Sequence, residues 1–278
     1  MTRLAVVIVT HESRDEIDAC LEALVRHGPP FATETVVVDN GSTDGTAAHV
    51  AARWPAVRVL AGDNTGFAAG CNRGIAATAG ELVLLLNPDT EVGPGSVARL
   101  VAALDARPDA AIAGPRIVNG AGDAEMSFGA MISPLVEARR KLLLAALDRG
   151  YAPVRAWAAR HTRRVREVDW VSGACLLVRR ADAEAVGGLD ERYFLYEEDV
   201  DFCAAIRARG RTVLFRPEAE VLHRRGRSAA RRPAAASSAY HASHLAFYAK
   251  HHPGWAPLLR LWQRARVSRG RGQGAGGR

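Results

Sequence analysis

A run of five large apolar residues, Leu82–Leu86, most constrains how this chain can fold. The run is short and sharply bounded, because Gly80 precedes it and Asn87-Pro88 follows it. Such a run is typical of a strand buried on both faces, as in a parallel sheet between two helical layers. Ligands bind beyond the carboxyl ends of such strands, so Asp89 is a candidate for chemistry. The alternative is that residues 87–90 form only a turn, since all four favour turns.

The rest of the chain alternates apolar segments with amphipathic ones. This alternation predicts an α/β domain with a mainly parallel central sheet flanked by helices. Strands are expected at 4–9, 34–38, 57–60, 82–86, 111–114, 174–178 and 212–215, and helices at 13–27, 47–53, 75–78, 97–104, 181–186, 202–209 and 237–248. The turn after the first strand lacks G-x-G-x-x-G, which argues against a dehydrogenase that binds NAD or FAD.

Composition narrows the class of protein. The 278 residues are 48% apolar, which is enough for one good core. The four cysteines form no C-x-x-C pair, so we expect neither a structural zinc site nor a disulfide framework. Such cysteines indicate a protein from a reducing compartment. The sequence shows no secretory signal and no window of about 18 consecutive apolar residues. We therefore expect a cytoplasmic protein without a membrane-spanning helix.

Positive charge is concentrated near the end of the chain. Residues 221–278 hold 12 of the 37 Lys and Arg and none of the 30 Asp and Glu. A tail of one sign can bind an anionic membrane surface or a nucleic acid, or can be a solvated disordered end. It has no zinc-finger spacing and no RNA-binding signature, so we expect no nucleic-acid partner. Trp255 and Trp262 among arginines favour the membrane interface.

Residues 119–168 differ from the segments around them. Their apolar pattern is weak, and they contain nine basic residues between Arg139 and Arg166. This composition fits one or two amphipathic helices on a membrane surface. It fits equally well a mobile insertion over an active site.

Three further groups of polar residues are candidates for binding or catalysis. Asp39 ends the second expected strand, where it can bind a base or ribose or simply cap a turn. Residues 64–74 contain three glycines, which let a backbone approach a ligand, and Arg73 is their one cation. The acids at 197–201 suit the first turn of a helix, but their position after an aromatic run favours a site.

Six motifs follow one another in the chain: Val9-Thr10-His11, residues 38–45, residues 64–72, Asn87-Pro88-Asp89, residues 187–190 and residues 198–201. Their ordered series resembles family 2 glycosyltransferases, and more narrowly the rhamnosyltransferase-like branch that builds bacterial cell-surface polysaccharide. The resemblance covers about residues 4–250. It implies a GT-A fold at 1–250, with a basic and partly disordered tail at 251–278, and an inverting transfer from a nucleotide sugar.

The resemblance also implies roles for individual residues in catalysis. Inverting transfer needs a base for the acceptor hydroxyl and a cation for the leaving diphosphate. By resemblance, Asp199 is the base, with Glu198 beside it. Asp89 is the ligand of a divalent cation, Mn²⁺ or Mg²⁺, and His223 is its second ligand. Asn87 replaces the first acid of the D-x-D-like triplet and is a weaker ligand, which gives His223 more importance.

The resemblance implies a binding site for the nucleotide sugar as well. Asp39 would recognise the nucleoside base, with Thr10 and Glu12 lining its pocket. Trp170, Ser172 and Gly173 would lie near the donor sugar or the acceptor. The predicted site is completed by Asn64, Gly66, Arg73 and Asn87. The donor would be a dTDP- or UDP-sugar, with dTDP-rhamnose favoured, and the acceptor a glycan or a polyprenyl-linked sugar at the inner face of the cell membrane.

Two other functions are compatible with such a sequence. One is a catalytically degenerate partner protein that binds nucleotide sugars without transferring them. The other is a nucleotidyltransferase. That activity requires a glycine-rich basic loop near the first strand, and residues 10–18 offer one arginine and no glycine.

Overall fold

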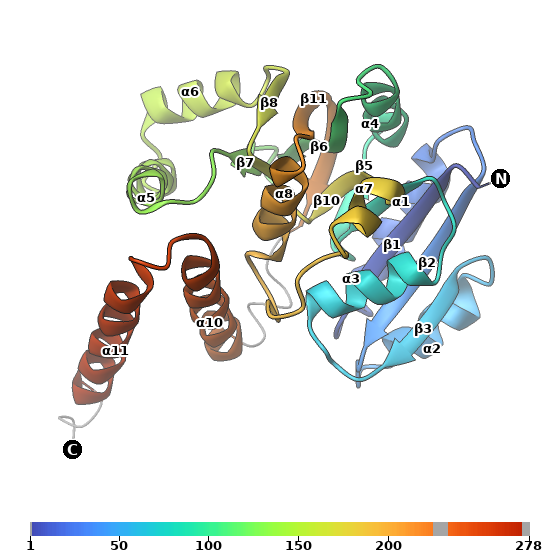
Figure 1. Ribbon diagram of the computed structural model, residues 1–278. Helices are drawn as coiled ribbons and strands as arrows, with labels where there is room; N and C mark the ends of the chain where they lie inside the picture. The colour runs from blue at the N-terminus through green and yellow to red at the C-terminus, as the bar shows by residue number, and fades with distance from the viewer. Residues whose placement is uncertain (1, 225–232, 274–278) are drawn as a thin grey trace.

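The computed structural model describes residues 2–224 and 233–273. Their strands form one large sheet and one small sheet (Figure 1). The large sheet has nine strands in the order β3-β2-β1-β4-β10-β6-β11-β5, with β8 also paired to β11. Their bounds are β1 Leu4–Thr10, β2 Thr33–Asn40, β3 Arg58–Gly62, β4 Leu82–Leu86, β5 Thr90–Val92, β6 Ala110–Val118, β8 Arg166–Val168, β10 Cys175–Arg179 and β11 Thr212–His223. The small sheet pairs β7 (Phe128–Gly129) with β9 (Trp170–Val171).

The large sheet combines two directions. Strands β3, β2, β1 and β4 are parallel neighbours, and β6 is parallel to β11. Strand β10 runs antiparallel to both β4 and β6, and so joins the two parallel parts. The expected α/β sheet is therefore confirmed, with β10 and the edge strands β5 and β8 as its antiparallel members.

Helices cover both faces of the sheet and are placed by the alternation of side chains along the strands. The helices are α1 Ile17–His27, α2 Thr46–Arg53, α3 Phe67–Ala76, α4 Ser96–Asp105, α5 Pro134–Asp148, α6 Ala152–His161, α7 Arg180–Ala185, α8 Glu198–Ala208, α10 Pro233–His251 and α11 Ala256–Gln273. In β1, Val7 and Val9 face one core with α3, α7, α8 and α10, whereas Val6 and Ile8 face the other with α1, α2 and α4.

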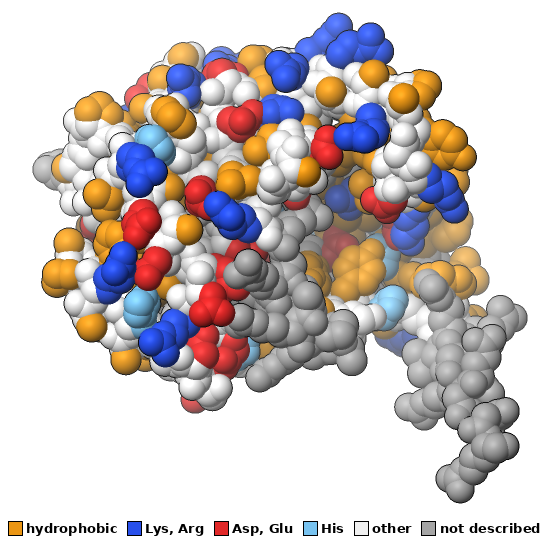
Figure 2. All heavy atoms as spheres, turned by 180° about the vertical axis from the view of Figure 1, so that it is seen from behind, with side chains coloured by type: hydrophobic (Ala, Val, Ile, Leu, Met, Phe, Trp, Pro, Cys, Tyr) orange, Lys and Arg blue, Asp and Glu red, His pale blue; other side chains and the backbone are white. Residues whose placement is uncertain are grey.

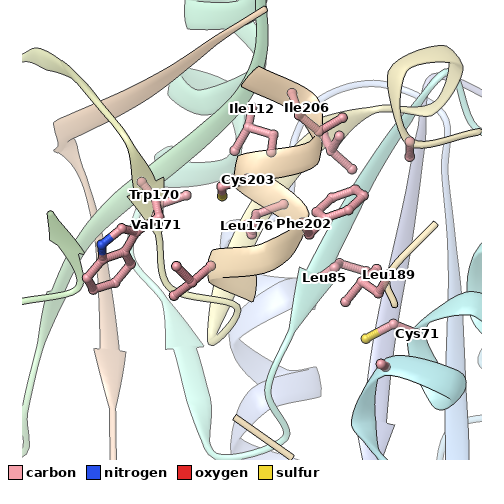
Figure 3. Packing of buried hydrophobic residues seen from close by; sticks show 14 of the residues in the cluster. Cys71, Leu85, Ile112, Trp170, Val171, Leu176, Leu189, Phe202, Cys203 and Ile206 are labelled. Atoms are coloured by element: carbon pink, nitrogen blue, oxygen red, sulfur yellow. The ribbon is translucent and has the colours of Figure 1, made fainter. Parts of the chain in front are cut away.

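Figure 3 shows how α8 lies on the first of these cores. Phe202 and Ile206 of α8 pack with Ile112 and Leu176 of the sheet. All four side chains are fully or almost fully buried. The packing fixes α8, and with it the acids of its first turn, against the middle of the sheet.

Two strands are longer than the sequence predicted. We expected β6 to end at Gly114 and β11 at Phe215, because Pro115 and Pro217 follow. However, β10 pairs with β6 only through Ile112 and Ala113, so Pro115 falls where that partner is absent. Pro217 falls inside a register shift between Arg216 and Glu220, a bulge that tolerates proline.

Helix α3 begins much earlier than expected. We predicted a loop at 64–74 and a helix from Ile75, whereas the helix starts at Phe67. Gly70 and Gly74 lie one turn apart, facing β1 and β2. A Cβ on Gly70 would lie 2.7 Å from Val9, and one on Gly74 would lie 2.2 Å from Val7. These glycines therefore let the helix pack closely on the sheet.

The basic segment 119–168 contains α5 and α6, which confirms the expectation of helices there. Helix α10 follows β11, and α11 occupies most of the tail that we expected to be partly disordered. Residues 274–278 lie outside the described residues. Among the described helices, none is both long enough and apolar enough to span a bilayer.

Candidate functional site

The carboxyl ends of β1 and β2 bring Thr10 and Asp39 together. The two residues are register partners. The Thr10 hydroxyl donates to Asp39 Oδ1 at 3.2 Å, and the Ser42 hydroxyl donates to the same oxygen. Asp39 is only 3% exposed, so its carboxylate is fixed by these hydroxyl groups. Its other oxygen, Oδ2, receives neither of these hydrogen bonds.

Glu12 connects the loop after β1 to the loop after β2. Its Oε1 accepts hydrogen bonds from the Thr43 main-chain N–H at 2.9 Å and from the Thr43 hydroxyl at 3.0 Å. The main-chain bond is the larger cause that holds the pKa of Glu12 below its usual value. Glu12 N also donates to the Ser42 hydroxyl at 2.9 Å. The predicted base-binding residues Thr10, Glu12 and Asp39 thus form one hydrogen-bonded unit.

Gly66 joins this unit to the second half of the chain. Its carbonyl accepts from the Asn40 side chain at 2.8 Å, and its N–H donates to Asn64 Oδ1 at 3.3 Å. Its φ is +96°, and a Cβ there would lie 2.7 Å from the Phe194 carbonyl. Only glycine fits this position without strain.

Arg73 lies against the end of β3. Its guanidinium donates to the Ala61 carbonyl at 3.2 Å and covers Gly62. Ala61 and Gly62 are the register partners of Asp39 and Asn40. The structure therefore places Arg73 beside the strand ends of the predicted nucleotide pocket, in contact with main chain.

The segment Asn87–Asp89 is fixed from both sides. Asn87 N donates to the Ala174 carbonyl at 2.9 Å, and Arg224 N donates to the Asp89 carbonyl at 2.9 Å. The Thr90 hydroxyl closes the turn on the Asn87 carbonyl at 2.6 Å. Residues 87–90 form the predicted turn, and this turn lies directly after the end of β4. A turn and a position at the strand end, the two alternatives from the sequence, therefore occur together.

His223 lies beside Asp89 because β11 reaches it. His223 is the register partner of Thr90, and its Nε2 is 3.2 Å from Asp89 Oδ1. Its Nδ1 is 3.6 Å from Glu125 Oε2. Burial opposes a charge on this ring, but the two carboxylates outweigh it and raise the pKa of His223 to about 9. A metal ion that binds Nε2 must therefore displace a proton.

Asp89 and His223 form a pair of ligand atoms rather than a complete cage. Within the described residues, no three His, Cys, Asp or Glu side chains gather where they could hold a metal ion. Adjacent ligands of an octahedral Mg²⁺ are about 3 Å apart, which matches the 3.2 Å between Nε2 and Oδ1. The two atoms are therefore close enough to bind one divalent ion, whose remaining ligands would come from outside the pair.

Asp199 and Glu198 begin α8. Asp199 Oδ2 accepts from Gly173 N at 2.8 Å, and Asp199 Oδ1 accepts from its neighbour Val200 N at 2.8 Å. Burial is the main cause that raises the pKa of Asp199, and the charge of Glu197 adds to it. Glu198 is 6% exposed, and burial and the charge of Asp199 raise its pKa well above the usual value. A carboxylate with a raised pKa suits a general base.

Trp170 lies on β9, and Ser172 and Gly173 follow on the turn that meets Asp199. The Trp170 indole is only 4% exposed and donates to the Ala130 carbonyl at 2.9 Å. Ser172 N donates to the Ser127 carbonyl at 2.8 Å. These contacts show a role in shaping the turn. The Arg140 guanidinium lies over the Trp170 ring, 5.1 Å from the ring centroid.

Sequence reasoning missed two groups of residues at this site. Glu125 meets His223 because Val118 and Ala124 form a β-bridge that turns the chain back. His244 of α10 is 4% exposed and donates from Nδ1 to Glu197 Oε1 at 3.0 Å. The apolar stripe of α10 was visible in the sequence, and a histidine within that stripe was the only signal for this contact.

Sequence comparison found a matching family and similar curated proteins. The family described as Glycosyl transferase family 2 matches residues 5–164. The chain is 37% identical to the N-acetylglucosaminyl-diphospho-decaprenol L-rhamnosyltransferase of Mycobacterium tuberculosis H37Rv, over 92% of this chain and 87% of that protein. It is 27% identical to the low-salt glycan biosynthesis hexosyltransferase Agl10 of Haloferax volcanii, over 72% of this chain and 60% of that protein.

Solved glycosyltransferase structures show the same GT-A fold. A mannosyltransferase from Pyrobaculum calidifontis, in complex with GDP-Man and Mn²⁺, superposes with a TM-score of 0.58 over 93% of this chain and 68% of its own. GalNAc-T7 with UDP, GalNAc and Mn²⁺ gives 0.60 over 81% of this chain and 44% of its own. The identities are 19% and 17%, so these structures support the fold alone.

Proposed function

The chain belongs to glycosyl transferase family 2, and on that premise we propose that it is an inverting, metal-dependent sugar transferase. The donor we propose is a nucleotide-diphosphate sugar, with dTDP-rhamnose first and UDP-sugars second. The acceptor we propose is an N-acetylglucosamine linked through diphosphate to a polyprenol. The rhamnosyl group and the acceptor follow the name of the mycobacterial relative, which is similar along 92% of this chain. The dTDP carrier follows the family resemblance of the sequence.

The nucleoside of the donor would bind at the ends of β1, β2 and β3. Asp39 offers a buried carboxylate there, and Thr10 and Glu12 fix the loops around it. A buried acceptor of this kind pairs with the N–H of a base or with ribose hydroxyls. Gly66 lets main chain come close to the ligand, and Arg73 lies at the rim near β3. Asn64 and Asn87 complete the proposed pocket.

One observation carries the catalytic proposal: Asp199 is held in place by main-chain N–H groups at the first turn of α8. Its orientation is therefore fixed before an acceptor binds. Its raised pKa makes it a stronger base than an ordinary aspartate. In the reaction it would take the proton of the acceptor hydroxyl while that oxygen attacks the anomeric carbon, and the nucleoside diphosphate leaves from the opposite side.

Asp89 and His223 would hold the divalent ion, Mn²⁺ or Mg²⁺. When bound, such an ion neutralises the charge that develops on the leaving diphosphate. Glu125 faces the other nitrogen of His223 and would orient the ring so that Nε2 points at the ion. Asn87 at the start of the turn would contribute a neutral side chain to the sugar-diphosphate site.

The surface of the chain supports docking on an anionic membrane. Nine of the eleven large apolar side chains that are exposed in the described residues belong to α5, α6, α11 and the loops beside them: Leu135, Leu142, Tyr151, Trp157, Val165, Trp255, Leu258, Leu261 and Trp262. Figure 2 shows Lys and Arg interleaved with such side chains where α5 and α6 lie. Apolar and basic side chains together bind the interface of an anionic bilayer.

The test combines donor binding with transfer. We expect dTDP-rhamnose with Mn²⁺ or Mg²⁺ to raise the melting temperature, because a ligand that binds only the folded state stabilises it. Asp199→Asn should keep this shift and lose transfer by about 10²- to 10⁴-fold. Transfer at the wild-type rate in that variant would remove Asp199 as the base. A thermal shift without transfer to any acceptor by the wild type would favour a degenerate binding protein.

A further inference from the structure

Helix α5 carries three charged side chains toward the rest of the molecule, at Glu137, Arg140 and Lys141. Spacings of three and four residues place them on one side of the helix. Glu137 accepts from Tyr248 at 2.8 Å and from His244 Nε2 at 3.1 Å, both on α10. Lys141 lies 5.7 Å from the Trp262 ring of α11. The arrangement of α5 opposite α10 and α11 is visible in Figure 1.

Arg140 differs from Glu137 and Lys141 because it points toward Trp170 and the turn that follows it, next to the proposed base Asp199. Its guanidinium lies over the ring of Trp170, 5.1 Å from the centroid. Trp170 is three residues before Gly173, whose N–H binds Asp199 at 2.8 Å. Within the described part of the chain, no hydrogen bond or ion pair is recorded for Arg140. The side chain is an exposed cation whose five N–H donors remain available.

The charge of Arg140 also reaches the base. It acts to lower the pKa of Asp199, against the larger effects of burial and of Glu197. It acts in the same direction on Tyr240 of α10. The contact that places Arg140 is its position over Trp170, on the strand that leads to the Gly173 N–H bound by Asp199.

We propose that Arg140 binds the phosphate next to the sugar of a diphosphate-linked acceptor. This inference rests on the proposed function and deepens it. In such an acceptor, the attacking hydroxyl and the first phosphate are substituents of the same sugar ring. A cation beside the turn that binds Asp199 is therefore placed to bind that phosphate. The planar fork of an arginine matches phosphate oxygens, and stacking on Trp170 holds that fork in plane.

The position of Arg140 is fixed by the rest of α5. Glu137, one turn earlier, is tied to a buried histidine and a buried tyrosine of α10. The cation is thus presented by a helix anchored at two points and not by a free loop. The donor diphosphate has its own site at Asp89 and His223, which come from β5 and β11 and not from α5.

The experiment compares two variants on two acceptors. The variants are Arg140→Gln and, as a matched control, Arg139→Gln, an exposed neighbour for which no contact is recorded. The acceptors are an alkyl-diphosphate-linked N-acetylglucosamine and the alkyl glycoside of the same sugar without phosphate. Melting temperatures of both variants verify folding. Each acceptor is assayed with dTDP-rhamnose and Mn²⁺, and the KM of the donor is measured in the same series.

We expect Arg140→Gln to raise the KM of the diphosphate acceptor by about 10- to 100-fold, as for loss of a hydrogen bond to a charged group. The KM of the donor and the kcat/KM of the phosphate-free acceptor should stay within about twofold. Arg139→Gln should match the wild type, and Arg140→Lys should fall between, because it keeps the charge and loses the fork.

Three results would overturn the inference. Equal losses on both acceptors would show that Arg140 acts on the base or the fold, and a raised KM for the donor alone would assign it to the donor diphosphate. Arg140→Gln behaving like Arg139→Gln would show that it binds neither. Wild-type protein that binds donor but transfers to neither acceptor would instead overturn the proposed function, and this inference with it.

Discussion

Glu198 and Asp199 are adjacent in the chain but have different surroundings. Asp199 accepts two main-chain hydrogen bonds, which favour its charged form. Glu198 is more deeply buried, and its Oε2 has no hydrogen-bond partner in the part of the chain that the structure describes. Burial and the neighbouring charge raise the pKa of Glu198 well above 4.5. We therefore assign the negative charge of the pair to Asp199 and the proton to Glu198.

This assignment predicts how stability depends on pH. A carboxyl whose pKa is raised by folding holds its proton in the folded state and releases it on unfolding. Protonated Glu198 therefore contributes fully to stability below pH 4.5, its usual pKa. This contribution is lost as the pH rises from 4.5 toward the raised pKa of the folded state. Glu198→Gln should remove this decrease, which amounts to about 1.4 kcal/mol for each unit of pKa shift.

Urea unfolding at pH 5, 6, 7 and 8 measures the effect. Asp63→Asn is a suitable control, because Asp63 is exposed. The same pH slope in Glu198→Gln and in the wild type would contradict the assignment of the proton to Glu198.

Several residues that the sequence proposed for the site lie close together in the structure, but their partners were not all foreseen. Asp89 and His223 are 134 positions apart, yet the family resemblance paired them as metal ligands, and the structure puts them 3.2 Å apart. Glu125 escaped notice because its segment has no regular pattern, and only the bridge between Val118 and Ala124 returns it to the site. Such a contact depends on a local turn that leaves no periodic signal.

At the scale of elements, α10 holds the turn before α8, at Leu195–Glu197, in an unusual shape. Tyr196 and Glu197 have φ of 72° and 68°, the left-handed region that non-glycine residues rarely adopt. Ser243 donates to the Leu195 carbonyl at 2.8 Å, and His244 donates to Glu197. Farther along α10, Lys250 binds Asp201 of α8 at 2.8 Å. These contacts offset the strain of the turn that precedes Asp199.

His244 is the buried centre of this contact, and its removal should have a pH signature. Burial opposes its charge, but Glu137 and Glu197 outweigh it and raise the pKa of His244 to about 9. A histidine with a raised pKa stabilises the fold fully below pH 6.5, and this stabilisation is lost as the pH rises toward 9. We expect His244→Gln to lower the free energy of unfolding by about 3 kcal/mol at pH 6.

The difference between His244→Gln and the wild type should shrink as the pH increases from 6 to 10. Chemical denaturation at both ends of this range measures it. A difference that is constant with pH would mean that the histidine acts through packing alone, without its charge.

The elements themselves were predictable where the periodic pattern was uninterrupted. Strands β1, β2 and β4 and helices α1, α4 and α8 lie close to their expected positions. The errors came from residues that usually end an element. Pro115 and Pro217 are accommodated by a missing partner and a bulge, and Gly70 serves helix packing. Only the neighbouring strand decides whether such a residue ends an element, and a single sequence does not show that neighbour.

At the scale of the whole molecule, the exposed apolar side chains are unevenly distributed. They lie mainly on α5, α6 and α11, and Lys141 near Trp262 joins the first of these helices to the last. We expect Trp255→Ser, Leu258→Ser and Leu261→Ser together to weaken binding to anionic vesicles by about tenfold or more. Each side chain is over half exposed in water and would be buried in the interface.

Co-sedimentation with vesicles of neutral and anionic lipid measures this binding. Val25→Ser is the control, because Val25 is 76% exposed on α1, away from these helices. Unchanged binding of the triple variant would exclude this surface as the membrane contact. The melting temperature of the triple variant should match that of the wild type.

The antiparallel strand β10 sets the order in which the sheet can be completed during synthesis. Strands β3, β2, β1 and β4 come from the first 86 residues, so this parallel half of the sheet can assemble on the ribosome from consecutive segments. One edge of β4 stays unpaired until residues 175–179 have been synthesised. Strand β6 needs the same segment on one side and β11 on the other. Until then, the exposed edges and apolar faces of these strands are open to wrong pairing. Asp199 and His223, the proposed base and the proposed second metal ligand, are therefore among the last parts of the candidate site to be put in place.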